Sequence, residues 1–245
     1  MSAFTPRLRM FAGPNGSGKS TLKSVLPKEL LGVYLNPDEM EQEIRRQGFL
    51  DFNAYNVSVT ADEVLAFFKG SSFLISEGFG DEVKRLDFSN GRLNFANVKM
   101  NSYLASVAAD FLRQKLLEQK ISFTFETVMS HHSKVDLLEQ AQLAGYRTYL
   151  YFIATDDPAI NISRVRNRVK QGGHAVPEDK IASRYHRSLD LLVDTIRHTK
   201  PCLRFRQFGR QPEAHLAGGD NGRQGVGDEN RSGACVVQTF RPGQN

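Results

Sequence analysis

The chain has 245 residues, with 32 Lys and Arg against 27 Asp and Glu, and a formal net charge of +5. This length allows one domain with its own core, and no basic run alternates with aromatic residues as in nucleic-acid-binding segments. No apolar run reaches membrane-spanning length, and the start lacks a signal-peptide core. Cys202 and Cys235 have no metal-ligand spacing. We therefore expect a cytoplasmic protein that binds neither nucleic acid nor a membrane.

A Gly-rich segment directly follows the first predicted strand, residues 8–12. It has the spacing Gly-x-x-x-x-Gly-Lys-Ser and leads into a predicted helix, which is the context of a phosphate-binding P-loop. In such a loop the backbone N–H groups surround a phosphate, the lysine reaches the β- and γ-phosphates, and the serine hydroxyl binds Mg²⁺. We predict that a nucleoside triphosphate binds here, with Lys19 and Ser20 in those two roles. The predicted binding residues are Gly13, Pro14, Asn15, Gly16, Ser17, Gly18, Lys19, Ser20 and Thr21.

Two further predicted strands deliver a carboxylate at their C-terminal ends, where open α/β sheets bind their ligands. Asp38 follows the strand 33–35 and is a candidate general base. Its alternative role is an Asx or N-cap residue that starts the helix 39–47. Glu126 lies at the end of the alternating strand 121–127 and, with Thr127, is a candidate contact for a substrate or for Mg²⁺. The alternative for Glu126 is a strand-end carboxylate in solvent.

Residues 48–100 differ in character from the flanking α/β pattern, and we predict that they form an insertion. Thr60 and Glu63 form a capping-box pattern before an apolar helix, and Asn90-Gly91 is typical of a tight hairpin turn. The insertion either recognises the substrate or packs against the edge of the core, and we favour substrate recognition.

Two predicted helices after the central strand 146–153 each carry a pair of arginines. Arg164 and Arg168 share a face of the first helix, and Arg184 and Arg187 lie on the second, beyond a Gly172-Gly173 break. Such a helix pair resembles a lid over a triphosphate, whose arginines stabilise the charge of the transferred phosphoryl group. The alternative is a solvated basic helix face.

The sequence after residue 204 is Gly-rich and contains few apolar residues. Residues 202–208 could add one more strand, but the stretch from Gly209 onward cannot bury enough surface to offset its ordering entropy. We predict a kinase-like domain over residues 1–204 and a disordered Gly-rich tail over 205–245.

Taken together, the chain resembles the zeta-toxin family of P-loop kinases over roughly residues 7–200. The resemblance rests on the P-loop, on a strand motif that ends in Glu126 and on a long arginine motif, and Asn36-Pro37-Asp38-Glu39 matches less tightly. The three motifs are residues 13–21, 123–130 and 164–189. The family usually continues after its lid helix with another apolar strand, and we hypothesise that the reading frame shifts near Pro201.

The resemblance implies an ATP- and Mg²⁺-dependent phosphotransferase with an α/β, three-layer P-loop NTPase fold, a mainly parallel sheet, a helical insertion and an arginine-bearing lid. It implies that Asp38 is the base on an acceptor hydroxyl and that Glu126 contacts the substrate. It further implies a small-molecule acceptor of the UDP-sugar type and an antitoxin protein as partner. One of Arg164 and Arg168, and one of Arg184 and Arg187, would contact the γ-phosphate. Two rival functions are a nucleotide-switch ATPase without an acceptor, and an inactive ATP-binding partner of another protein.

Overall fold

A computed structural model describes residues 5–173, 175–197, 203–208 and 235–240, the last two ranges by backbone alone. The chain divides into two compact units, which are treated separately below. The insertion unit comprises Met1–Arg7 and Pro27–Glu126, and the P-loop unit comprises Leu8–Leu26 and Thr127–Asn245. The Gly-rich tail predicted from Gly209 lies outside the described residues, apart from one strand at 235–240.

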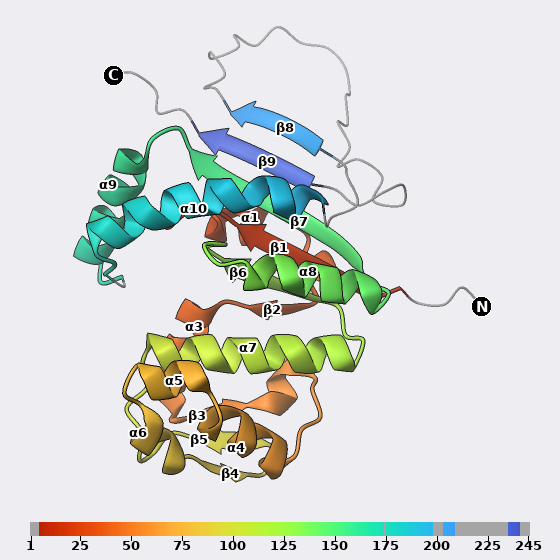
Figure 1. Cartoon of the computed structure of the whole chain (residues 1–245), viewed down its shortest axis with the longest axis vertical. Helices are drawn as coiled ribbons and strands as arrows, with labels where there is room; N and C mark the ends of the chain where they lie inside the picture. Colours follow the sequence, from red (N-terminus) through yellow and green to blue (C-terminus); the bar gives the residue numbers. More distant parts are fainter. Residues whose placement is uncertain (1–4, 174, 198–202, 209–234, 241–245) are drawn as a thin grey trace, which may run out of the picture. The chain divides into compact units, whose positions relative to one another are not determined.

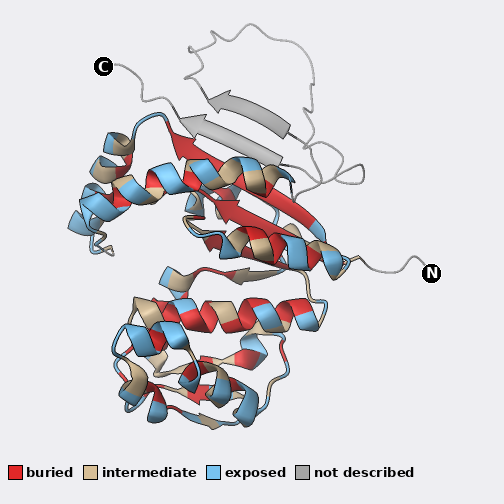
Figure 2. Ribbon diagram, in the orientation of Figure 1, coloured by how far each residue is buried: buried red, intermediate tan, exposed pale blue. Residues whose placement is uncertain are grey.

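The strands of the P-loop unit are ordered β1-β7-β9-β8, and β9 runs parallel to both of its neighbours (Figure 1). β1 and β7 are buried at every position after their first residue (Figure 2), as their apolar and aromatic sequences require. Their bounds are β1 (Arg7–Ala12), β7 (Arg147–Thr155), β8 (Leu203–Phe208) and β9 (Cys235–Phe240). The predicted first and central strands are therefore confirmed.

The described part of the P-loop unit contains four helices: α1 (Ser20–Val25), α8 (Ser133–Leu143), α9 (Pro158–Lys170) and α10 (Glu178–Arg197). α8 and α9 contact β7, and α10 contacts both α8 and α9. α9 begins at Pro158, because the Asp157 carboxylate accepts the Ala159 N–H at 2.7 Å and Pro158 occupies the first turn. Gly172, in the left-handed region at φ +87°, and Gly173 close the end of α9 through hydrogen bonds to its last turn.

The insertion unit contains a parallel pair of strands and a separate antiparallel sheet of order β3-β5-β4. The strands are β2 (Val33–Leu35), β3 (Phe49–Asp51), β4 (Asp87–Ser89), β5 (Arg92–Asn94) and β6 (Phe123–Thr127). The helices are α2 (Lys28–Leu31), α3 (Pro37–Gln47), the 3-10 helix η1 (Phe52–Tyr55), α4 (Ala61–Lys69), α5 (Ser72–Ser76), α6 (Gly80–Lys84) and α7 (Ser102–Glu118). The predicted helical insertion therefore also holds a small sheet of its own.

Aromatic side chains from distant parts of the insertion unit form its core around Phe111 of α7. Phe67 and Phe52 pack edge-on against the Phe111 ring at centroid distances of 5.0 and 5.6 Å, and Phe88 lies 6.0 Å from Phe52. The predicted capping box at Thr60 and the predicted hairpin are both present. The sequence thus predicts the local elements of this unit, and the aromatic cluster joins them.

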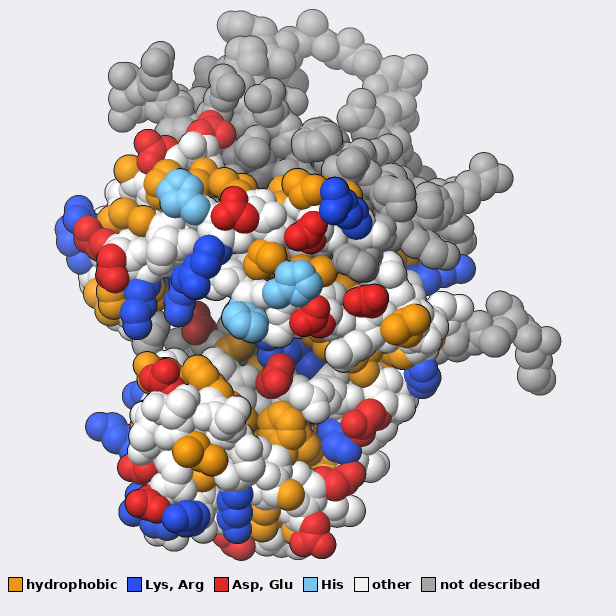
Figure 3. Space-filling view, viewed as in Figure 1, with side chains coloured by type: hydrophobic (Ala, Val, Ile, Leu, Met, Phe, Trp, Pro, Cys, Tyr) orange, Lys and Arg blue, Asp and Glu red, His pale blue; other side chains and the backbone are white. Residues whose placement is uncertain are grey.

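The surface of the described part shows charges of both signs. On the face in Figure 3, Lys and Arg side chains lie interspersed with Asp and Glu. Among the described residues, no helix is long and apolar enough to cross a membrane. The α/β class with parallel strands is confirmed.

Candidate nucleotide site and acceptor-side carboxylates

The P-loop joins β1 to α1, and its shape depends on close approaches that only glycine permits. Gly13 has φ +139°, and a Cβ atom there would lie 1.9 Å from the main-chain oxygen of Ile153 in β7. Gly16 has φ +74°, and its Cβ would lie 2.8 Å from the main-chain oxygen of Asn161 in α9. The loop is therefore packed against β7 and α9 at a distance that excludes side chains.

Two side chains of the loop have the chemistry of phosphate and metal binding. The Lys19 Nζ donates to the main-chain oxygens of Gly13 and Pro14 at 2.8 and 2.9 Å, so its ammonium group lies over the loop. Ser20 is the first residue of α1 and is exposed. The Ser17 hydroxyl is buried and has no hydrogen-bond partner within the described residues. The loop has no room for side chains, it carries the Lys19 ammonium group, and it holds the buried Ser17 hydroxyl. These features fit the phosphates of a nucleotide.

The predicted lid arginines differ in their surroundings. The Arg164 Nη1 atom of α9 lies 3.4 and 3.5 Å from the main-chain oxygens of Gly16 and Ser17, so this side chain reaches the P-loop. Arg168 and Arg184 are half-buried. Arg187 is exposed, and its Nε donates to the Ser183 oxygen of its own helix at 3.3 Å. Arg164 therefore contacts the loop, and Arg187 bonds the backbone of its own helix.

Asp38 is the second residue of α3, in the insertion unit. The cap of this helix is Asn36, whose Oδ1 accepts the N–H groups of Asp38 and Glu39 at 3.0 and 3.4 Å. The alternative role of Asp38 as the N-cap is therefore wrong, because Pro37 already starts the helix. The exposed Asp38 carboxylate is not needed for capping.

Glu126 is buried at the end of β6, with an exposed fraction of 8%. The Tyr34 hydroxyl of β2 donates to its Oε1. Burial, and then the Glu126 carboxylate, raise the pKa of Tyr34, so this hydroxyl remains a donor at neutral pH. The alternative of a solvent-exposed Glu126 is wrong, because the residue is buried and its carboxylate accepts the Tyr34 hydroxyl. The next residue, Thr127, uses its hydroxyl to accept the Met129 N–H at 3.0 Å.

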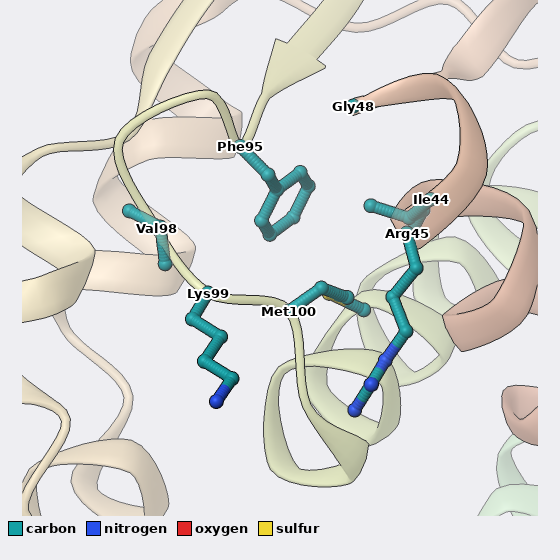
Figure 4. A pocket seen from close by; sticks show the side chains of 7 residues that line it. All are labelled: Ile44, Arg45, Gly48, Phe95, Val98, Lys99 and Met100. Atoms are coloured by element: carbon teal, nitrogen blue, oxygen red, sulfur yellow. The ribbon is translucent and has the colours of Figure 1, made fainter.

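A pocket of about 230 Å³ lies in the insertion unit between α3 and the segment before α7 (Figure 4). Its wall is mostly apolar, and the side chains of Arg45 and Lys99 extend in the same direction beside it (Figure 4). The Arg45 guanidinium also forms an ion pair with Glu41 at 2.6 Å. The lining residues are Ile44, Arg45, Gly48, Phe95, Val98, Lys99 and Met100. This composition suits a molecule with an apolar part and negative charge.

The residue that sequence reasoning missed is Asn161 of α9. Its side chain has no exposed surface, and its Nδ2 donates to the Asn15 main-chain oxygen at 2.5 Å. The two residues are 146 positions apart, so no local pattern connects them. The described residues contain no group of three or more His, Cys, Asp and Glu side chains that could hold a metal ion.

The fold and the Gly-rich loop define a P-loop nucleotide-binding protein of the α/β class. The family model described as zeta toxin matches residues 96–205. The zeta-toxin resemblance is thereby confirmed over this part of the chain, which includes Glu126, Asn161 and all four predicted lid arginines. The P-loop and Asp38 lie outside the matched residues.

Similar proteins were found in sequence and in structure. An uncharacterised protein of Haemophilus influenzae is 33% identical over 69 residues, which are 28% of this chain and 49% of that protein. The chain thus matches about half the length of this relative. A structure of the PezAT chromosomal toxin–antitoxin system of Streptococcus pneumoniae has 17% identity and a TM-score of 0.42, covering 81% of this chain and 67% of that one. The complex of AvrRxo1-ORF1 and ORF2 with ATP has 15% identity and a TM-score of 0.44, covering 80% of this chain and 51% of that one.

Proposed function

We propose that this protein is an ATP- and Mg²⁺-dependent phosphotransferase that transfers the γ-phosphate of ATP to a hydroxyl group of a small molecule. The observation that carries the proposal is the P-loop. Two of its glycines approach β7 and α9 too closely for any side chain, and the Lys19 ammonium group lies over it. This arrangement suits the phosphates of a nucleotide.

The proposed roles follow from the chemistry of each side chain. Lys19 binds the β- and γ-phosphates, and the Ser20 hydroxyl is one ligand of the Mg²⁺ that enters with ATP and neutralises phosphate charge. Asp38 accepts the proton of the acceptor hydroxyl. The hydroxyl oxygen forms a bond to the γ-phosphorus while the bond to the β–γ bridging oxygen breaks, and ADP leaves. Arg164, which reaches the P-loop, stabilises the charge on the transferred group, with Arg168, Arg184 and Arg187 as further candidates.

The insertion unit is the proposed acceptor-binding part. Asp38 and Arg45 are seven residues apart on α3, so they share a face of the helix and lie about 10 Å apart along its axis. Arg45 belongs to the pocket in Figure 4, where Lys99 adds a second cation. An acceptor with a hydroxyl near Asp38 and a negatively charged part near Arg45 fits this spacing, and a UDP-sugar has both features. Glu126 and Thr127 are the other proposed acceptor contacts.

PezAT is a toxin–antitoxin system, and we propose an antitoxin protein as the partner of this chain as well. The rival functions are a nucleotide-switch ATPase and an inactive ATP-binding protein that acts through a partner. Both rivals bind ATP, but neither has an acceptor.

Transfer of labelled γ-phosphate from ATP to a panel of nucleotide sugars, and to a total metabolite extract, tests the proposal. We expect a labelled product that Lys19→Ala abolishes. Asp38→Asn should lower transfer by about 10²-fold or more with unchanged ATP affinity, because the base is lost and the P-loop is intact. Glu39→Gln, a neighbouring exposed carboxylate on α3, is the matched control and should retain activity. Release of free phosphate alone would favour the ATPase, and ATP binding without turnover would favour the inactive partner.

A further inference from the structure

Asn161 uses both ends of its amide group inside the protein. The Asn15 main-chain oxygen can only accept, so the Asn161 NH₂ group faces it, at 2.5 Å. The Asn161 Oδ1 is then left to accept the Thr155 hydroxyl, whose oxygen also lies 3.1 Å from the Asp157 main-chain oxygen. A side chain without exposed surface and with both ends bonded has one orientation.

This contact controls the direction of a P-loop N–H group. The peptide unit between Asn15 and Gly16 is planar and trans, so its C=O and N–H point in opposite directions. Because Asn161 holds the C=O toward α9, the Gly16 N–H points away from α9. Gly16 itself packs against the main-chain oxygen of Asn161, which leaves the loop little freedom to rotate this peptide.

The same network reaches α10. Thr155 ends β7, and its main-chain oxygen accepts the hydroxyl of the buried Tyr185 at 2.7 Å. Tyr185 lies on α10 between Arg184 and Arg187. Asn15, Asn161, Thr155 and Tyr185 therefore connect the P-loop, α9, β7 and α10 within the P-loop unit.

We propose that Asn161 is a positioning residue for phosphate binding, which acts by orienting the Asn15–Gly16 peptide. In this proposal Thr155 fixes the Asn161 side chain through its hydroxyl, and Tyr185 fixes α10 to the main chain of Thr155. The inference rests on the proposed function, because it requires that the loop binds the phosphates of ATP. It assigns a role in phosphate binding to Asn161, a side chain outside the Gly-rich motif.

Calorimetric titration of ATP into the full chain, with thermal unfolding of the same samples, tests the inference. Asn161→Asp keeps the size of the side chain and the acceptor for Thr155, but it replaces the donor to Asn15 by an oxygen. We expect the Kd of ATP to rise about ten- to a hundredfold, as for a buried hydrogen bond lost without replacement. Thr155→Val leaves Asn161 in place without its anchor and should raise the Kd about three- to tenfold. The Tyr185→Phe variant should raise it less.

Thr195→Val is the matched control. It removes a buried hydroxyl of α10 that bonds the Leu191 oxygen at 2.6 Å and lies 3.4 Å from the Met129 sulfur, and both of these partners lie outside the P-loop. A merely structural loss of this kind lowers the unfolding midpoint without changing the Kd of ATP, and we expect this result for Thr195→Val. If Asn161→Asp folds and binds ATP with an unchanged Kd, the inference is overturned and the proposed function stands. If Asn161→Asp does not fold, an unchanged Kd of ATP in Thr155→Val has the same consequence. Failure of the unmodified chain to bind ATP would overturn both.

Discussion

The P-loop and the acceptor-side carboxylates are held in place by different kinds of contact. At the P-loop, the backbone forms the site, and it is fixed from outside by close packing at Gly13 and by the side chain of Asn161. In the insertion unit, the side chains form the site. Glu126 is buried and bonded to Tyr34, whereas Asp38 is exposed and its backbone N–H is held by Asn36. The P-loop therefore has no room for an added side chain at Gly13, whereas the positions of Glu126 and Asp38 depend on a few single hydrogen bonds.

The largest expected effect comes from Gly13→Ala. The added Cβ would lie 1.9 Å from the Ile153 oxygen, so β1 or β7 must shift, and we expect a loss of about 3 kcal/mol or more in unfolding free energy together with loss of ATP binding. Chemical denaturation and calorimetric titration measure the two effects. Gly145→Ala is the control, because Gly145 also has positive φ, +84°, but has open space around it. It should cost about 1–2 kcal/mol and leave ATP binding intact. Equal losses in the two variants would contradict the role of the close approach.

The second effect concerns Tyr34. Tyr34→Phe removes the hydroxyl that donates to the buried Glu126, and we expect a loss of about 1–3 kcal/mol at neutral pH and a higher KM for the acceptor. The pKa of Tyr34 is raised in the folded protein, so its contribution to stability is complete below about pH 10, where the tyrosine of the unfolded chain ionises, and declines as the pH rises further. Denaturation between pH 8 and pH 11 should show a smaller alkaline decline for Tyr34→Phe than for the unmodified chain.

Tyr146→Phe provides the comparison for Tyr34. Burial raises the pKa of Tyr146 to about 12. Loss of the Tyr146 hydroxyl should therefore also reduce the decline of the unfolding free energy at alkaline pH. Tyr146 belongs to the P-loop unit and not to the acceptor-side carboxylates, so the KM for the acceptor should not change. An acceptor KM that changes equally in both variants would remove Tyr34 from the acceptor site.

The smallest effect should come from Asn36→Ala. Loss of this N-cap should cost about 1 kcal/mol and lower kcat several-fold, because α3 then frays at Asp38. Thr60→Ala removes the cap of α4 in the same unit and should cost a similar amount. Only the first variant should lower kcat at saturating substrate. Equal kcat values in the two capping variants would show that the start of α3 does not position the catalytic base.

The sequence predicts those elements whose structure is determined by residues close together in the chain. Glycines at fixed spacing mark the P-loop, Asp157-Pro158 marks the start of α9, and Asn90-Gly91 marks the hairpin between β4 and β5. β3 was not predicted, because three residues become a strand only by pairing with β5, about forty positions later.

The candidate site shows the same division between local and distant causes. The residue types of the P-loop, Asp38 and the arginines are visible in the sequence. The hydrogen bonds that hold them are not, because Asn161 and Asn15 are 146 positions apart, and Tyr34 and Glu126 are 92 apart. A polar residue at a helix turn or in a strand looks like an ordinary surface residue until its distant partner is known.

The contact between Asn161 and the P-loop also bears on how this chain behaves when it is shortened. A product that ends before residue 155 keeps every glycine of the motif and the phosphate-binding lysine, yet it lacks Thr155, Asn161 and Tyr185. Such a fragment would be recognised by its motif and would still lack Asn161, which bonds the loop, and the partners of that side chain. Under the proposed role of Asn161, the Gly-rich fingerprint and the side chains that orient it are encoded in opposite halves of the gene.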